Sequence, residues 1–324
     1  MIEKAEISPD GEVSILIKNI TDQGKFNTIK EQILSLVKEA GLGEKCNVEL
    51  KKASPPGQAP KPGVKISKLL SNIKHVIAVG SGKGGVGKST VAVNLAIATA
   101  KKGYSVGLLD ADILGPSIPT MMGTEDEQPF ADEQKKIMPI ENHGIKMMSI
   151  GYFVEKNMPV IWRGPLVVGA LKQFMTDVRW PDLDYLFIDL PPGTGDVQLT
   201  LTQEAKIDGV VIVTTPQKVA YIDAIKGIVM FKRLEIPVIG IIENMSYFQC
   251  PDTGKKHHIF GKGGGELVSK EHDVPLIGQI PIDGSITEHG DSGHPIVDSL
   301  PDSAITKAYM EAVDNLVKGG NDRS

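Results

Sequence analysis

The chain has 324 residues, of which 41% are hydrophobic and 23% are charged, with a formal net charge of −5. This length suffices for one large α/β domain with a small appendage, and the acidic balance argues against a protein that binds nucleic acid through a basic face. No apolar run is long enough to span a bilayer, and the polar N-terminal segment is unlike a signal peptide. Because only two cysteines are present, Cys46 and Cys250, we expect no disulfide framework and a cytoplasmic protein.

The first part of the chain, residues 1–52, predicts a small α+β domain of β-α-β order. Apolar side chains alternate over residues 13–17, recur at helical spacing over residues 26–40, and alternate again at residues 48–50. The next segment, residues 53–65, is rich in proline and glycine and predicts a linker.

Residues 66–320 predict one large domain in which short apolar runs alternate with helical segments. The runs are apolar on both faces, as the strands of a buried parallel sheet are, and helices are expected at residues 90–102 and 220–233. This order predicts a doubly wound, mostly parallel α/β sheet. The expected strands cover residues 75–80, 105–110, 185–189, 210–213 and 238–242.

A glycine-rich loop lies between the first of these strands and the first of these helices. It reads G-x-x-x-x-G-K-S from Gly82 to Ser89, which is the P-loop pattern in its strand-to-helix context. Its N–H groups and helix dipole suit phosphate oxygens, Lys88 is expected to reach the β- and γ-phosphates, and the Ser89 hydroxyl to bind Mg²⁺. We therefore expect ATP to contact Gly82, Lys83, Gly84, Gly85, Val86, Gly87, Lys88, Ser89 and Thr90.

The same loop also fits the G-x-G-x-x-G pattern of dinucleotide-binding enzymes, from Gly80 to Gly85. That pattern expects an acidic residue about 20 residues later, at the end of the next strand. The acid at the end of that strand, Asp110, comes later than this, and the pattern requires neither Lys88 nor Ser89. A nicotinamide or flavin enzyme is therefore the weaker interpretation.

An ordinary P-loop does not require Lys83. The segment Gly82-Lys-Gly-Gly resembles the deviant Walker A motif of the MinD/ParA/nitrogenase-iron-protein class, P-loop ATPases in which this lysine reaches the nucleotide of a dimer partner. The resemblance implies a homodimer that binds and hydrolyses ATP, with Lys83 and Lys88 as catalytic residues.

Carboxylates follow two of the expected strands, at the edge of the sheet where ligands bind. By resemblance to this class, Asp110 and Asp189 hold Mg²⁺, and Asp112 is a catalytic residue that orients or deprotonates the attacking water. The Pro-Pro-Gly-Thr-Gly-Asp segment that follows Asp189, residues 191–196, would sense the γ-phosphate. Asp196, at its end, either shares that role or caps the next helix.

Adenine recognition is expected at the ends of later strands. The chain has no N-K-x-D guanine signature, and Asn244 follows a strand at the place where this class reads adenine. Pro281 and Asp283 lie near the purine in related folds.

Several longer segments are similar to the Mrp/ApbC family of ATP-binding iron–sulfur cluster carriers, over nearly all of residues 64–318. The resemblance implies a [4Fe-4S] cluster bridging a dimer, apo iron–sulfur client proteins and an assembly scaffold as partners. Residues 1–52 look like a shortened MIP18-type domain. The matching segments are Gly82–Thr90, Asp110–Pro119, Trp162–Pro165, Asp189–Asp196, Thr215–Gln217, Glu243–Ser246 and Phe260–Gly265.

The chain departs from this family at the cluster ligands. The family usually carries C-x-x-C after the Glu-Asn-Met-Ser segment, whereas here Thr253 stands in place of the second cysteine of a pair that begins with Cys250. A hydroxyl is a poor iron ligand, so each subunit offers one thiolate there. Asp252, His257 or His258 could complete a site.

Two other functions stay open at this level. One is a MinD/ParA-like ATPase switch that positions cargo and carries no cluster, and the other is a scaffold whose bound ATP locks a dimer. The net charge of −5 disfavours nucleic acid as a partner. Because the last helix carries Glu311 and Asp314 on its polar face, we expect it to pack on the sheet and not on a membrane.

Overall fold

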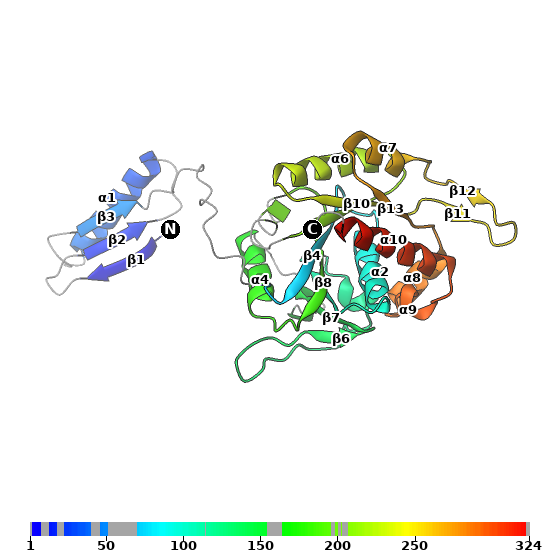
Figure 1. Cartoon of the computed structure of the whole chain (residues 1–324). Helices are drawn as coiled ribbons and strands as arrows, with labels where there is room; N and C mark the ends of the chain where they lie inside the picture. Colours follow the sequence, from blue (N-terminus) through cyan, green and yellow to red (C-terminus); the bar gives the residue numbers. More distant parts are fainter. Residues whose placement is uncertain are drawn as a thin grey trace. The chain divides into compact units, whose positions relative to one another are not determined.

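The computed structural model describes residues 2–7, 13–17, 23–39, 46–50, 70–113, 115–153, 164–195, 198–199, 202 and 207–321. The chain divides into two compact units, Met1–Val64 and Lys65–Ser324, each of which is described by itself (Figure 1). The linker predicted at residues 53–65 lies outside the described residues. None of the described helices has the length and apolar character needed to cross a membrane.

The described part of the small unit is a three-stranded sheet with one helix. Strand β1 pairs antiparallel with β2, which pairs parallel with β3, and helix α1 contacts β3. The sequence predicted the β-α-β part but missed β1. The register of β1 against β2 shifts between Ile2 and Lys4, and such an irregularity breaks the alternation that marks a strand in sequence. The elements are β1 (Ile2–Ile7), β2 (Val13–Ile17), α1 (Gln23–Glu39) and β3 (Cys46–Leu50).

The described part of the large unit is built on an eight-stranded sheet of order β13-β10-β9-β4-β8-β5-β7-β6. Its strand pairs are parallel except β6–β7, so the predicted mostly parallel, doubly wound sheet is confirmed. The strands are β4 (Ile73–Ser81), β5 (Val106–Asp110), β6 (Ile140–Asn142), β7 (Ile145–Ser149), β8 (Leu183–Asp189), β9 (Gly209–Thr214), β10 (Val238–Glu243) and β13 (Leu276–Gln279).

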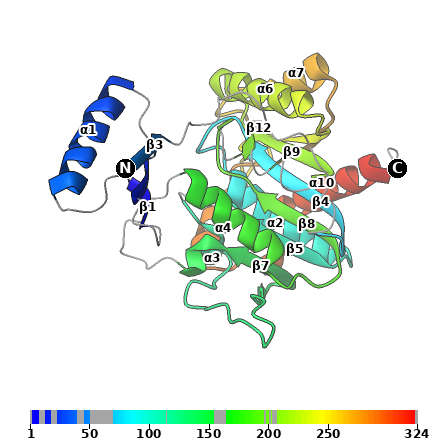
Figure 2. The same ribbon diagram turned by 90° about the vertical axis from the view of Figure 1, so that its left-hand side faces the viewer.

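Helices cover both faces of this sheet. One core packs α4, α6 and α7 on the sheet, and the other packs α2 and α10 on the opposite face; Figure 2 shows α4 in front of the strands. The central strands are buried on both sides for this reason, and they read as continuous apolar runs. The helices are α2 (Lys88–Lys101), α3 (Ile118–Met121), α4 (Gly164–Thr176), α6 (Lys218–Arg233), α7 (Gly264–His272), α8 (Gly284–Asp291), α9 (Ile296–Ser299) and α10 (Ala304–Asn321), with the 3₁₀ helix η2 (Ile150–Phe153).

A small antiparallel hairpin, β11 (Phe248–Gln249) with β12 (Lys256–His257), projects from the end of the sheet near α7 (Figure 1). Its connecting turn contains Cys250. The sequence did not predict this hairpin, because each strand is only two residues long.

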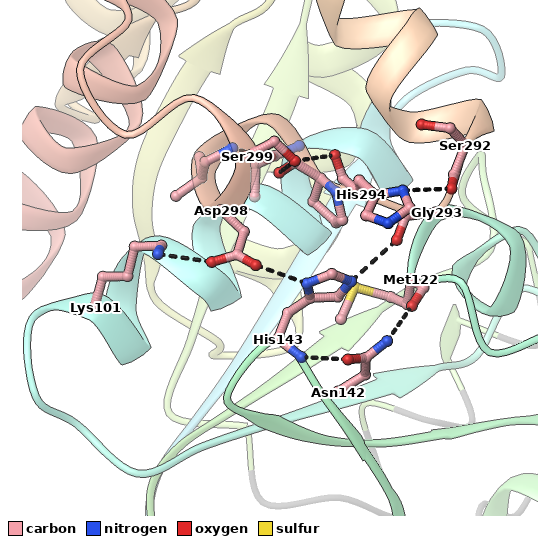
Figure 3. Close-up of polar contacts among 12 residues, drawn as sticks. Lys101, Met122, Asn142, His143, Ser292, Gly293, His294, Asp298 and Ser299 are labelled. Atoms are coloured by element: carbon pink, nitrogen blue, oxygen red, sulfur yellow. Dashed lines mark hydrogen bonds and ion pairs between the residues drawn. The ribbon is translucent and has the colours of Figure 1, made fainter.

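A polar cluster joins the β6–β7 turn to the connection between α8 and α9 (Figure 3). The ring of His143 lies with Nδ1 2.8 Å from Asp298 Oδ2 and Nε2 3.0 Å from the carbonyl oxygen of Gly293. Lys101 pairs with the other carboxylate oxygen of Asp298 at 2.7 Å. Asp298 therefore holds three elements together: α2, the β6–β7 hairpin and α9. Burial alone would raise the pKa of Asp298, but the hydrogen bonds from Lys101 and His143 hold it below its ordinary value of 3.8.

We expect Asp298→Asn to reduce the free energy of unfolding by about 1 kcal/mol at pH 7, since hydrogen bonds to a charged group are lost at a half-exposed site. Because the folded pKa of Asp298 is lowered, its stabilising effect is complete above the ordinary carboxyl pKa and disappears as the pH falls through the folded value. Thermal melts should therefore show Asp298→Asn less stable than wild type at pH 7, and the difference should begin to shrink as the pH falls below about 4. A difference that persisted unchanged in acid would contradict this assignment.

Candidate functional site

The glycine-rich loop connects the end of β4 to the start of α2. Gly87 precedes the helix with φ 79°, a left-handed conformation that favours glycine. Gly82 lies against α6: a Cβ built on it would be 2.1 Å from the carbonyl carbon and oxygen of Asp223. The loop therefore needs glycine at its beginning for space and at its end for conformation.

Lys88 is the buried cation of this loop. Its side chain is 6% exposed, and Nζ lies 2.7 Å from Asp189 Oδ1 and 3.5 Å from Asp112 Oδ2. The ammonium also donates to Ser89 Oγ at 3.1 Å. The structure thus brings three predicted site residues, Ser89, Asp112 and Asp189, together around the ammonium of a fourth, Lys88.

Asp110 and Asp189 face one another at the ends of adjacent strands, where they are register partners of β5 and β8. Both are fully buried. Burial, and then the charge of Asp189, raise the pKa of Asp110 to about 8, although Ser149 Oγ donates to its Oδ2 at 2.8 Å. Burial likewise raises the pKa of Asp189, despite its ion pair with Lys88.

The donor set here fits a magnesium ion. Asp189 Oδ2 is buried without a hydrogen-bond partner among the described residues, and Asp110, Asp112 and Asp189 together place three carboxylates beside the single ammonium of Lys88. A hard divalent cation satisfies such an oxygen and favours the ionised form of these carboxyl groups, against the burial that raises the pKa of Asp110. Because Mg²⁺ keeps several waters and phosphate oxygens as ligands, one or two carboxylates suffice.

A cavity of about 450 Å³ opens beside Lys88. Lys83 is half-buried and lines it, so its side chain is available to a ligand in the cavity, and Ser81 Oγ donates to its carbonyl oxygen at 2.9 Å. The lining residues are Ser81, Lys83, Gly84, Gly85, Gly87, Lys88, Ser89, Thr90, Asp112, Pro116, Ser117, Thr120, Met121, Pro192 and Asp291.

Sequence reasoning missed the wall of this cavity opposite the loop. Thr120 and Met121 come from the short helix α3, and Asp291 comes from the end of α8, far along the chain. Thr90 Oγ1 contacts Met121 Sδ at 3.8 Å. The Asp110–Pro119 motif was a signal for part of this wall, but no local pattern marks Asp291.

The residues predicted to read adenine are not among those that line the cavity. Asn244 is 6% exposed, and its Nδ2 donates to the carbonyl oxygen of Val86 at 2.9 Å, so it holds the P-loop backbone. Pro281 is buried, and Asp283 is exposed and caps α8 by accepting from the N–H of Ser285. Among the residues described as lining the cavity, none of these three appears, and their contact with adenine stays a prediction.

Cys250 lies in the turn of the β11–β12 hairpin and is partly exposed. The hydroxyl of Thr253, and then the N–H groups of Thr253 and Asp252, hydrogen-bond to its sulfur and lower the pKa of the thiol. Thr253, which we interpreted only as a lost ligand, therefore stabilises the thiolate of Cys250.

The other proposed cluster ligands are not gathered around Cys250. Around Cys250, the described residues form no group of three or more His, Cys, Asp and Glu side chains that could hold a metal ion. His257 pairs in the ladder with Phe248, and His258 Nδ1 lies 3.3 Å from the carbonyl oxygen of Ser246. The predicted residues Asp196, Trp162 and Arg163 lie outside the described residues, as does the side chain of Cys46.

Comparisons with known proteins agree with this geometry. The ParA family model, described as NUBPL iron-transfer P-loop NTPase, matches residues 72–317. The iron-sulfur cluster carrier protein of Aquifex aeolicus is 50% identical over 244 residues, which are 75% of this chain and 67% of that protein. The mitochondrial iron-sulfur protein required for NADH dehydrogenase of Arabidopsis thaliana is 49% identical over 251 residues, 77% of this chain and 80% of that protein.

Two solved structures share the fold. The nucleotide-binding protein of Archaeoglobus fulgidus, in complex with ADP, is 42% identical with a TM-score of 0.63 and covers 70% of this chain and 90% of its own. The cell division ATPase MinD of Pyrococcus furiosus is 22% identical with a TM-score of 0.57, covers 76% of this chain and 99% of its own, and supports the fold alone. The resemblance to the Mrp/ApbC family is thereby confirmed, and the chain belongs to the ParA/NUBPL family of iron-transfer P-loop NTPases.

Proposed function

We propose that this chain is an ATP-hydrolysing iron–sulfur cluster carrier that works as a nucleotide-dependent homodimer. One observation carries the proposal: the same chain has a complete P-loop around Lys88 and, at Cys250, a partly exposed turn whose hydrogen bonds stabilise the thiolate. Identity of 50% to relatives named as cluster carriers favours a carrier over a switch without a cluster.

The nucleotide part of the cycle follows from the P-loop. The N–H groups of the loop and the start of α2 bind the phosphates, and Lys88 leaves its contact with Asp189 to reach the β- and γ-phosphates. Ser89, Asp110 and Asp189 would hold Mg²⁺, which would supply positive charge against the charge that develops on the phosphates. Asp112 Oδ2 lies 3.5 Å from Lys88 Nζ, which supports a role for its carboxylate beside the γ-phosphate, where it would orient the attacking water.

The dimer follows from Lys83 and from the cargo. Lys83 lines the nucleotide cavity without an ion pair among the described residues, so it would be available to the nucleotide of a second subunit. Each subunit offers one thiolate at Cys250, and a cluster needs more than one ligand. Two subunits would hold the cluster, a [4Fe-4S] group as cargo, between their Cys250 turns.

Loose ligation suits a carrier. A site with few protein ligands releases its cargo more readily than a closed four-cysteine site, so apo iron–sulfur proteins with complete ligand sets would take the cluster, and an assembly scaffold would supply it. We propose a cytoplasmic protein that makes no specific contact with nucleic acid or membrane.

Anaerobic reconstitution with iron and sulfide tests the cargo site. We expect about one cluster per two chains of wild type, seen by iron quantification and absorption spectroscopy. Cys250→Ala should lose this iron, and Cys46→Ala, which removes the other cysteine, should retain it. Equal iron in wild type and Cys250→Ala would refute the site at Cys250, and no iron in any of them would favour an ATP-driven switch without a cluster.

Replacing Asp112 with Ala should leave ATP affinity within about twofold of wild type and slow hydrolysis by about 10²–10⁴-fold, the usual effect of removing a general base. Phosphate release and equilibrium nucleotide binding measure the two quantities separately. Normal turnover in this variant would show that another group positions the water.

Asp189→Asn tests the proposed magnesium site. Asn keeps an acceptor for Lys88 but loses the anionic oxygen that has no partner, so the gain in ADP affinity on adding Mg²⁺ should fall by about 10–100-fold. Calorimetric titrations with Mg²⁺ and with EDTA measure this gain. Asp184→Asn, at the other end of the same strand, is the matched control and should respond to Mg²⁺ as wild type does. An unchanged response in Asp189→Asn would remove this residue from the site.

A further inference from the structure

One short segment, Glu243–Ser246, lies between the P-loop and the hairpin that carries Cys250. Strand β10 ends at Glu243, whose side chain is 1% exposed. Its carboxylate accepts hydrogen bonds at both oxygens: Oε1 from Ser246 Oγ at 2.6 Å and Gln279 Nε2 at 3.2 Å, and Oε2 from the N–H of Gly265 at 2.6 Å. A buried carboxylate with three donors is held in one position.

The next residue along the chain contacts the P-loop. Asn244 Nδ2 donates to the carbonyl oxygen of Val86, and a Cβ built on Gly87 would lie 2.2 Å from the same nitrogen. The backbone N–H of Asn244 donates to the carbonyl oxygen of Thr214 at 2.8 Å. Any shift of the loop at Val86 or Gly87 therefore meets Asn244 directly.

The residues on the other side fix the hairpin. The carbonyl oxygen of Ser246 lies 3.3 Å from the ring of His258, just after β12. Helix α7 begins at Gly264, after the short loop that follows this histidine, and its first residue packs on the backbone of Pro216. Its second residue, Gly265, donates to Glu243. Both ends of the Cys250 hairpin are thus attached to the Glu243–Ser246 segment.

One rigid peptide plane joins the Cα atoms of Glu243 and Asn244, so a displacement of the backbone at either residue also moves the other. Binding of phosphates rearranges contacts of Lys88 in the same loop as Val86 and Gly87. We propose that Glu243 is a positioning residue that couples the state of the P-loop to the Cys250 turn, so that nucleotide binding changes the reactivity of the Cys250 thiol. The proposal rests on nucleotide binding in the proposed function and not on a bound cluster.

The coupling can be measured without iron. If nucleotide changes the state of the Cys250 turn, a ligand bound at that turn changes nucleotide affinity by the same factor. Coupling between two sites of one domain is commonly about fivefold or more. The thiol itself is the probe, because the reaction of Cys250 with iodoacetamide depends on its exposure and thiolate fraction.

The test compares alkylation rates of Cys250 with no nucleotide, with Mg²⁺–ADP and with Mg²⁺ plus a non-hydrolysable ATP analogue, read on the Cys250 peptide by mass spectrometry so that Cys46 does not contribute. We expect the wild-type rate to differ by about fivefold or more between nucleotide states. In Glu243→Gln, the amide offers one acceptor oxygen and sets an NH₂ group against a donor, so this ratio should fall to within about twofold of one.

Glu266→Gln makes the same chemical change one residue from Gly265, at an exposed position of α7, and should keep the wild-type ratio. Nucleotide affinity and oligomeric state are measured in the same samples, since a merely structural defect in Glu243→Gln would lower both binding and stability without removing the ratio selectively.

A second variant, Gly265→Ala, changes the contact between Gly265 and Glu243 at the glycine. In Gly265→Ala the added Cβ would lie 3.0 Å from Glu243 Oε2 and 3.1 Å from Glu243 Cβ, so it should also reduce the ratio, and it decides the case if Glu243→Gln does not fold. A wild-type ratio of one, or a folded Glu243→Gln with the wild-type ratio, would overturn the proposal. Loss of iron binding with an intact ratio would instead contradict the cargo assignment and leave the coupling standing.

Discussion

The structure depends on a cluster of buried ionisable groups at the carboxyl edge of the sheet. Lys88 and Asp189 form an ion pair with side chains 6% and 0% exposed, and Asp110 is buried beside them. Such burial costs free energy that the ion pair alone does not offset. In the proposed function, a phosphate–magnesium ligand bound by the P-loop, the ends of β5 and β8 and the start of α2 offsets this cost.

The parallel sheet explains how distant segments reach this edge. Strands β4, β5, β8 and β10 end in Ser81, Asp110, Asp189 and Glu243, so four polar groups from widely separated positions come together at one edge. In the proposed function, the first three serve the phosphate site. Glu243 faces α7 and the hairpin. The same edge of the sheet therefore connects the proposed nucleotide site with the Cys250 turn.

The elements that sequence reasoning predicted well are those in which local pattern and burial agree. The five central strands are apolar on both faces because both faces are covered, and the P-loop is marked by its own residues. Edge strands β6 and β13 and the two-residue strands of the hairpin depend on tertiary pairing and leave little local signal. Asp291 reaches the cavity only through the fold, and the contact of Asn244 with Val86 joins positions 158 residues apart.

The turn at Cys250 has a consequence for handling the protein. The hydrogen bonds to this partly exposed sulfur favour the thiolate. The thiolate is the form that peroxide oxidises most readily, first to sulfenic acid and then irreversibly. Thr253 gives this sulfur no neighbouring cysteine with which to form a protective disulfide. Material purified in air will therefore lose the Cys250 thiol progressively. If Cys250 holds the proposed cargo, the iron content of a preparation will also depend on its exposure to oxygen.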